Sequence, residues 1–277
     1  MTRCRTSYFA FIGFVVFFFP LLFAQQERSS SSLLNYYKRD INSWTPNESR
    51  HSHSVLHLQA LSHISFIFVN MDHRTDRKQQ FLLEMAGHGI EKSLFLRVAG
   101  VIHDLATLGA SKAWLKAFEE CYRSGKRLCC MFDDDFIFVA PYKNNTFLAR
   151  AFFYGLLYTF PFQFDAVFLS GAYKHPLQAH THVDSGEPNI FRAKAVFGAS
   201  AVCMPPSYVE DVIVDNVKEG IRLQEAHYEL TGASKPEFTI DFFMRKLQSI
   251  DNWFAVKVGM QRPTYSDIEK KMVMYEW

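Results

Sequence analysis

The chain has 277 residues, of which 48% are hydrophobic, 16% aromatic and 21% charged, and its formal net charge is +2. This composition is typical of one or two globular domains with a large apolar core, and it excludes a disordered, collagen-like or coiled-coil chain. Five cysteines are too few for a disulfide scaffold, and the near-balance of charge argues against nucleic acid as a partner.

Residues 1–24 have the pattern of a secretory signal or a signal-anchor. Arg3 and Arg5 precede an uncharged apolar run from Tyr8 to Ala24, which is close to the shortest helix that spans a bilayer. Leu22 is a poor match to the small residue expected before a cleavage site after Ala24. We therefore favour an uncleaved anchor that tethers the chain to a membrane, with cleavage and secretion as the alternative.

Residues 25–60 are polar and include a serine run and spaced histidines, which predicts a flexible stem with solvated histidines. Two tripeptides, beginning at Asn47 and Asn144, fit the N-glycosylation rule. Together with the N-terminal signal they favour the lumen of the endoplasmic reticulum or Golgi.

Four cysteines would lie in that lumen. One disulfide is possible among them, but their spacing does not give the pairing, and the alternative is that Cys129 and Cys130 are simply buried in a strand. The four are Cys121, Cys129, Cys130 and Cys203.

Residues 61–277 alternate strand-like apolar runs with helical patterns, which predicts a single α/β domain with a mostly parallel central sheet. Ligands of such sheets gather at the carboxyl ends of the strands. In chain order the predicted elements are strand Ile64–Val69, helix Thr75–Ala86, helix Ser111–Ser124, strands Leu128–Phe132 and Phe136–Val139, helix Phe147–Phe160, strands Ala166–Leu169 and Val196–Met204, helix Ser207–Leu230 with a break near Gly220, helix Thr239–Leu247 and strand Trp253–Val258.

Three aspartates, Asp133, Asp134 and Asp135, directly follow the apolar strand that begins at Leu128. Burying carboxylates without partners is costly, and a divalent cation removes that cost. Because side chains alternate along an extended segment, we expect Asp133 and Asp135 to share a face and to bind Mn²⁺ or Mg²⁺. The alternative is a solvated acidic turn.

A second polar cluster lies between the first strand and the first helix. Asn70 and Asp72 have the groups to hydrogen-bond a base or ribose, and Arg74 and Arg77 have the planar forks that pair with phosphate. The alternative is a local turn with surface ion pairs.

These two clusters, with five further segments in the same order, resemble glycosyltransferase family 25, which includes lipooligosaccharide and collagen hydroxylysine galactosyltransferases. Two positions depart from the family pattern: Lys112 stands in place of a histidine, and Asp133 in place of the usual glutamate. The matching segments are Val69–Arg77, Leu94–Val98, Leu108–Ser111, Met131–Asp135, Ala166–Gly171, Thr239–Phe243 and Gln261–Ile268.

The resemblance implies a GT-A-like, Rossmann-like fold and an inverting transfer from a nucleotide-sugar donor. In such a transfer Asp241 would be the base that takes the acceptor proton, and Asp133 and Asp135 would hold the metal. Asp241 could instead only stabilise the start of its helix. The donor-binding residues would be Asn70, Asp72, Arg74, Arg77, Ser111 at a helix start, Arg262 and Ser266.

The function expected from the sequence is therefore a membrane-anchored hexosyltransferase. It would move galactose or glucose, from a UDP-sugar, to a hydroxyl of a glycan, lipid or protein acceptor with the help of a divalent metal. The alternatives are a catalytically inactive lumenal binding module of the same fold and a metal-dependent hydrolase.

Overall fold

The computed structural model describes residues 49–172, 182–184, 190–256, 258–262, 264–266 and 271–273. The chain divides into two units, Met1–Arg50 and His51–Trp277, and the second contains every described strand. The predicted anchor (residues 1–24) and Asn47 lie outside the described residues. Within the part that is described, no helix combines the length and the apolar character needed to cross a membrane.

An eight-stranded mixed sheet forms the centre of the domain, with strand order β2-β1-β3-β8-β5-β9-β7-β6. Its strands are β1 (Ile64–Asn70), β2 (Phe95–Ala99), β3 (Leu128–Asp133), β5 (Ala166–Ala172), β6 (His182–Asp184), β7 (Ile190–Ala193), β8 (Phe197–Met204) and β9 (Trp253–Val256).

The prediction of a mostly parallel sheet holds for only part of it. Strand β1 runs parallel to β2 and β3, and β5 runs parallel to β9. Strand β8 runs antiparallel to both of its neighbours, β3 and β5, and β7 runs antiparallel to β6 and β9. Parallel neighbours need a long crossover, usually through a helix, and the described residues between β5 and β8 form strands instead.

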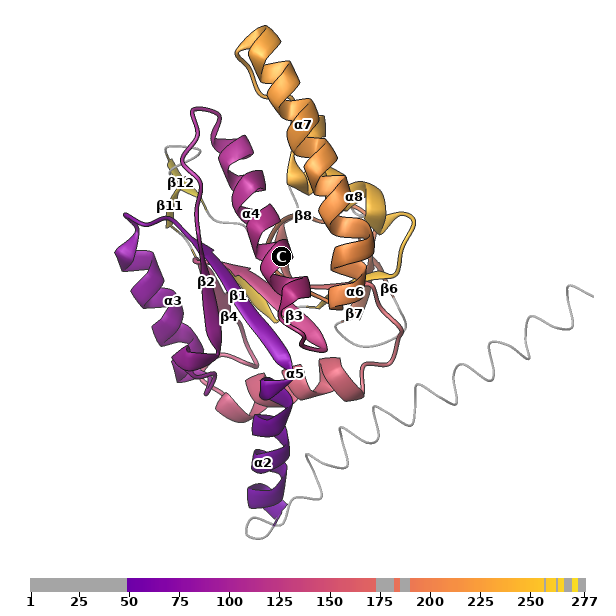
Figure 1. Cartoon of the computed structure of the whole chain (residues 1–277). Coiled ribbons are helices and arrows are strands. Elements are labelled where there is room, and N and C mark those ends of the chain that lie inside the picture. Colours follow the sequence, from indigo (N-terminus) through magenta and orange to yellow (C-terminus); the bar gives the residue numbers. More distant parts are fainter. Residues whose placement is uncertain are drawn as a thin grey trace, which may run out of the picture. The chain divides into compact units, whose positions relative to one another are not determined.

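Helices cover both faces of the sheet (Figure 1). Helices α4, α7 and α8 contribute to one apolar cluster, and α3 and α5 to the other. The helices are α2 (Ser49–Ser62), α3 (Thr75–Gly87), α4 (Ala106–Arg123), α5 (Thr146–Tyr158), α6 (Pro206–Tyr208), α7 (Val214–Thr231) and α8 (Ile240–Gln248), with short helical turns η1 (Lys92–Leu94), η2 (Val209–Ile213) and η3 (Pro236–Phe238).

Two small antiparallel sheets complete the description. Strand β4 (Phe136–Phe138) pairs with β10 (Gly259–Gln261), and β11 (Thr264–Ser266) pairs with β12 (Lys271–Val273). The first of these pairs returns the late part of the chain to the segment that directly follows the acidic triplet.

The observed helices differ from the predicted ones in three places. Helix α4 begins at Ala106, five residues before the predicted start. Buried residues hold its first turns, and no capping side chain marks this start in the sequence. Helix α7 continues through Gly220, where a break was predicted. A methyl group on Gly220 would lie 2.7 Å from the ring of Phe243, so this glycine lets α8 approach α7 closely.

The third difference is helix α2, which occupies part of the predicted flexible stem. His57 of α2 is buried, and its ring centroid lies 5.2 Å from those of Phe147 and Tyr154 on α5. This histidine is therefore a packing residue of the domain, and the stem cannot extend to residue 60.

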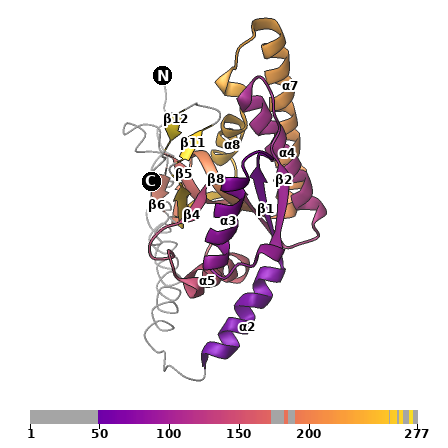
Figure 2. The same cartoon turned by 90° about the vertical axis from the view of Figure 1, so that its left-hand side faces the viewer.

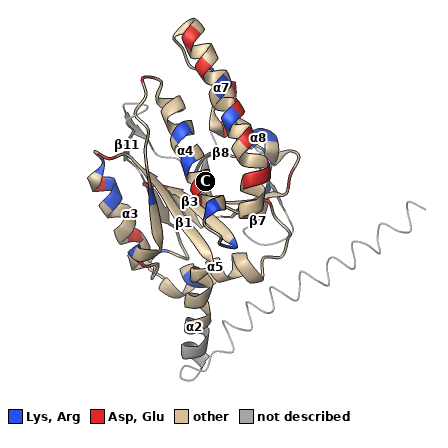
Figure 3. Cartoon of the chain, in the orientation of Figure 1, with Lys and Arg blue, Asp and Glu red and all other residues tan. Residues whose placement is uncertain are grey.

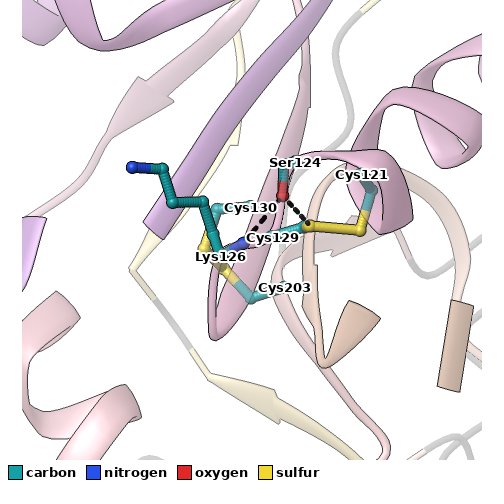
Figure 4. The surroundings of a disulfide bond; sticks show 6 residues. All are labelled: Cys121, Ser124, Lys126, Cys129, Cys130 and Cys203. Carbon is teal, nitrogen blue, oxygen red and sulfur yellow. Dashed lines mark hydrogen bonds between the residues drawn. A yellow bond between two sulfur atoms is a disulfide. The ribbon is translucent and has the colours of Figure 1, made fainter. Parts of the chain in front are cut away.

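Two disulfides hold the central strand β3 from its two faces (Figure 4). Cys129 is bonded to Cys121 of α4, with a Cα–Cα distance of 5.7 Å, and Cys130 to Cys203 of β8, with a Cα–Cα distance of 4.1 Å. Because the side chains of consecutive strand residues point to opposite faces, each bond enters a different apolar cluster.

The close contact of α7 with α8 leads to a prediction about stability. We expect Gly220→Ala to lower the free energy of unfolding by about 1–3 kcal/mol, because the added methyl group must displace Phe243. Gly87→Ala is the matched control, because the space around this helical glycine is open and alanine there adds up to about 1 kcal/mol of stability. Equal effects of the two substitutions in urea denaturation would contradict the packing argument.

Candidate functional site

Asp133, at the carboxyl end of β3, faces the layer that contains α4. Its Oδ1 accepts a hydrogen bond of 3.1 Å from Nε1 of Trp114. Burial raises the pKa of Asp133 well above its usual value, and the negative charges of Asp135, Asp134 and Asp241 raise it further. The Trp114 hydrogen bond opposes this shift only in part, so the site favours either a proton or a cation at this carboxylate.

Asp134 points toward α3 and β1 and is compensated there. Its Oδ2 accepts a hydrogen bond of 2.7 Å from Nδ2 of Asn70, and its Oδ1 accepts one of 3.1 Å from Nη1 of Arg77. Burial raises the pKa of Asp134, while Asn70 and Arg77 work against the shift. The role of Asp134 is to fix the positions of these two donors.

The two carboxylate oxygens of Asp135 differ in their surroundings. Its Oδ2 accepts a hydrogen bond of 2.7 Å from Nε2 of Gln261 and lies 3.8 Å from Nη1 of Arg77. Its Oδ1 is buried and has no hydrogen-bond partner among the residues that the structure describes. Burial raises the pKa of Asp135 to about 6, despite the opposing effect of Gln261.

The predicted alternation of the triplet is interrupted at Asp134. Strand β3 ends at Asp133, and Asp134 and Asp135 form a turn. Arg77 consequently reaches both Asp134 and Asp135, so Asp135 does not simply share the face of Asp133.

Asn70, at the end of β1, organises the neighbouring loop. Its Nδ2 donates to the carbonyl oxygen of Arg74 (3.0 Å) as well as to Asp134, and its Oδ1 accepts from Nε of Arg97 (3.1 Å). These bonds fix the amide between the loop, Asp134 and Arg97, and a role of Asn70 in binding a donor stays a prediction.

The other predicted donor residues in this loop form local pairs. Arg74 makes a two-pronged contact with Asp76, with both distances 3.1 Å, which lowers the pKa of Asp76 to about 2. Asp72 is exposed and accepts a hydrogen bond from Arg97, which lowers the pKa of Asp72. The exposed Asp72 fits the alternative of a turn with surface ion pairs. Arg74 is mostly buried and its charge lowers the pKa of Asp134, so it lies beside the acidic site together with Arg77.

Ser111 does not lie at a helix start. It is buried inside α4, and its Oγ donates to the carbonyl oxygen of Thr107 (3.0 Å). The argument that its position favours an anion therefore does not apply. The next residue, Lys112, forms an ion pair of 2.7 Å with Glu225 of α7.

The predicted residues near the C-terminus reach the site to different extents. The backbone N–H of Arg262 donates to the carbonyl oxygen of Asp135 (2.6 Å), and its Nη1 donates to Gln80 of α3 (2.8 Å). Ser266 ends β11, and its side chain is outside the described part. Asp241 lies in the first turn of α8, and its charge acts on Asp133.

Asn144, the second predicted glycosylation site, lies in the loop before α5. Its side chain is exposed and its backbone adopts a φ of 58°. Its N–H donates to Nε2 of the buried His88 (3.2 Å). The asparagine is therefore accessible, and its glycosylation stays a prediction.

Three residues of the site were missed by the sequence analysis. Arg97 is a lone cation near the end of a strand, and that position was a usable signal. Trp114 lies on the apolar face of its helix, and nothing in the sequence marks the indole N–H as a donor to a carboxylate. Gln261 reaches Asp135 only because β10 pairs with β4, a long-range contact with no local signature.

A divalent cation fits this donor set in part. In the described part of the chain, no three or more histidine, cysteine, aspartate or glutamate side chains are grouped so as to hold a metal ion. Mg²⁺ and Mn²⁺ are, however, commonly bound by one or two carboxylates together with water and substrate phosphates. The buried Oδ1 of Asp135, which lacks a partner, and the raised pKa of Asp133 are both consistent with such a cation.

No family model and no curated protein matches the chain. Among solved structures, A197 from STIV matches at 11% identity and a TM-score of 0.39, covering 77% of this chain and 94% of that one. UDP-glucose pyrophosphorylase complexed with UDP-glucose matches at 8% identity and a TM-score of 0.39, covering 75% of this chain and 79% of that one. Mannose-1-phosphate geranyltransferase from Thermus thermophilus matches at 9% identity and a TM-score of 0.37, covering 70% of this chain and 73% of that one. We draw no inference about chemistry from likenesses of this strength.

The raised pKa of Asp135 predicts how the metal-free protein responds to pH. Between its usual pKa of 3.8 and the folded value of about 6, the unfolded chain loses the Asp135 proton before the folded chain does, so stability falls as pH rises and stays lower above pH 6. Removing the charge with Asp135→Asn should therefore stabilise the protein by about 2–3 kcal/mol at pH 7.5 and much less at pH 4.

Urea denaturation in the presence of EDTA at the two pH values measures this effect. Asp215→Asn, on the exposed side of α7, is the control and should change stability by less than about 0.5 kcal/mol at either pH. A destabilising Asp135→Asn at pH 7.5 would contradict the assignment of Asp135 as an under-compensated buried charge.

Proposed function

We propose that the chain is an inverting, metal-assisted glycosyltransferase. It moves a hexose, galactose or glucose, from a UDP-sugar to a hydroxyl of a glycan, glycolipid or protein. The single observation that carries the proposal is the cluster of under-compensated carboxylates at the end of the central strand, where Asp135 has a buried oxygen without a partner and Asp133 faces the charge of Asp241. The sequence resemblance to glycosyltransferase family 25 supplies the reaction class.

In this proposal Asp133 and Asp135 hold Mn²⁺ or Mg²⁺ beside the donor diphosphate. When bound, such a cation neutralises the charge that develops on the diphosphate as the sugar leaves. Trp114 orients Asp133 and Gln261 orients Asp135, each through a hydrogen bond to one carboxylate oxygen. The second oxygen of each carboxylate takes no part in these two bonds. Arg77 balances the remaining charge of the triplet.

Asp241 serves as the base. An acceptor hydroxyl oxygen attacks the anomeric carbon from the side opposite the diphosphate, the bond from that carbon to the phosphate oxygen breaks, and the hydroxyl proton passes to the Asp241 carboxylate. The first turn of α8 keeps this carboxylate near Asp133.

The compartment belongs to the same proposal. The two disulfides agree with an oxidising lumen, and the exposed Asn144 agrees with a glycosylated loop. We infer a protein of the endoplasmic reticulum or Golgi that is anchored by its N-terminal apolar segment.

The direct test is a donor screen with the purified full chain, Mn²⁺ and a mixture of glycan, lipid and peptide acceptors. We expect release of UDP from UDP-galactose or UDP-glucose, and a loss of at least about 100-fold in Asp133→Asn and in Asp135→Asn. Asp215→Asn is the matched control and should keep full activity. Sugar recovered on an acceptor supports a transferase, free monosaccharide supports a hydrolase, and binding without turnover supports an inactive module.

The role of Asp241 has a separate test. We expect Asp241→Asn to lower kcat by about 10²–10⁴-fold, the usual contribution of a general base, because the acceptor proton loses its destination. Binding of UDP-sugar in the presence of Mn²⁺, measured by calorimetry, should change less than about threefold. A parallel loss of binding would assign Asp241 to donor or metal binding instead.

A further inference from the structure

Helix α5 is almost entirely apolar, although both of its ends are exposed. Arg150 is its one charged residue, and the Nε of Arg150 is used within the domain, donating to the carbonyl oxygen of Gly89 (2.9 Å). The next charged residue after it is Asp165. A helix that is apolar all round normally lies inside a core or in contact with lipid.

Packing accounts for the middle of the helix, where Phe152 and Leu157 are half-buried against the core beside the buried residues, but not for its two exposed ends. Phe147 and Tyr158 are 39% and 43% exposed. Figure 3 shows the contrast with α3 and α7, which carry charged residues along their length. The fully buried residues of α5 are Ala149, Phe153, Gly155 and Leu156.

Helix α2 extends the same apolar surface. It packs on α5 through His57, and its Val55, Leu56 and Leu58 are all exposed. Both views of the domain place α2 and α5 at one end, away from β11 and β12 (Figures 1 and 2). We call the exposed apolar side chains of these two helices the α2–α5 surface.

An open hollow of about 290 Å³ lies beside the C-terminal end of α5. Most of the residues that line it are aromatic or aliphatic, but polar atoms make up slightly more than half of the surface that it exposes. The guanidinium of Arg127, one of the lining residues, lies 5.2 Å from the centroid of the Tyr158 ring. The lining residues are Arg127, Leu128, Leu156, Leu157, Tyr158, Phe160, Phe162, Gln163, Phe164 and Pro205.

Two exposed cations, Lys126 and Arg127, lie next to this hollow. The Nζ of Lys126 donates to the carbonyl oxygen of Ser62 (2.8 Å), and the backbone N–H of Arg127 donates to the carbonyl oxygen of His63 (2.9 Å). These bonds join the basic pair to the end of α2. Aromatic side chains beside lysine and arginine are typical of surfaces that lie at the boundary between lipid headgroups and acyl chains.

We propose that the α2–α5 surface and its hollow dock on a lipid bilayer that contains anionic phospholipids. The apolar side chains enter the boundary region, and the basic pair meets headgroup phosphates. This inference does not depend on the proposed catalytic activity.

The chain itself favours lipid over a second copy of the protein. An uncharged apolar run, Tyr8–Ala24, precedes the first described residue, Ser49, by about 25 residues, so a segment suited to lipid is tethered to this end of the domain. A symmetric pair of copies joined through this surface would bring Lys126 and Arg127 close to their own counterparts, which is unfavourable.

Docking would set the direction in which the acidic site faces. Strand β3 starts at Leu128, which lines the hollow, and ends at Asp133. At about 3.3 Å per residue the two ends are roughly 16 Å apart. The docked domain would therefore present the carboxylates on the side away from the bilayer.

Lipid photo-crosslinking of the full chain in phosphatidylcholine–phosphatidylserine vesicles tests the proposal. The photoreactive residue p-benzoylphenylalanine replaces Tyr158 in one variant and Leu58 in a second, so that a folding defect in either does not decide the result. Ile102 is the control position, because it is apolar and 83% exposed but follows the carboxyl end of β2.

We expect phospholipid adducts at positions 158 and 58, detected by mass spectrometry, at a yield at least fivefold above that at position 102. Equal yields at the three positions, or crosslinks from 158 and 58 to a second copy of the chain, would overturn the proposal.

Discussion

The burial of Asp134 and Asp135, with the half-buried Asp133 directly before them at the end of the central strand, is the constraint on which the rest of the site depends. Asp134 is balanced by Asn70 and Arg77, whereas Asp133 and Asp135 each receive one hydrogen bond and retain raised pKa values. The fold thus supplies donors for part of this charge and leaves the rest for a proton or a cation. Removing carboxylates from water is costly enough that such an arrangement is rarely kept without a use.

The mixed sheet explains how distant segments meet at this point. The parallel strands β1 and β3 bring Asn70 and the triplet to one edge, and α4 supplies Trp114 from one layer while α3 supplies Arg77 from the other. The β4–β10 pair then returns the late chain to Asp135. Each of these side chains stands on or next to a regular element, which limits its freedom before any ligand arrives.

Much of this was accessible from the sequence, because the signals were local. Apolar runs located β1, β3, β4, β5, β8 and β9 and helices α3, α5 and α8 to within a few residues, whereas β2, β6, β7 and β10 to β12 were not among the predicted elements. The triplet after an apolar strand drew attention to Asp133 and Asp135, and their binding of a metal stays a prediction. The start of α4 at Ala106 was missed because buried residues rather than a capping side chain define it. Gln261 and the antiparallel placement of β8 were missed because strand pairing is a long-range property with no local pattern. Helix α2 was missed because its serines and histidines resemble a linker, while the buried His57, Ala60 and Leu61 hold its C-terminal half on the domain.

The consecutive cysteines of β3 have a consequence for how the chain folds correctly. If Cys129 and Cys130 exchanged partners, the strand would have to slip by one residue or turn over, and every side chain along it would change sides. Asp133 would then leave Trp114 and face α3, and Asp134 would lose Arg77. The native sulfur pairing therefore fixes the orientation of β3 in which Asp133 meets Trp114 of α4.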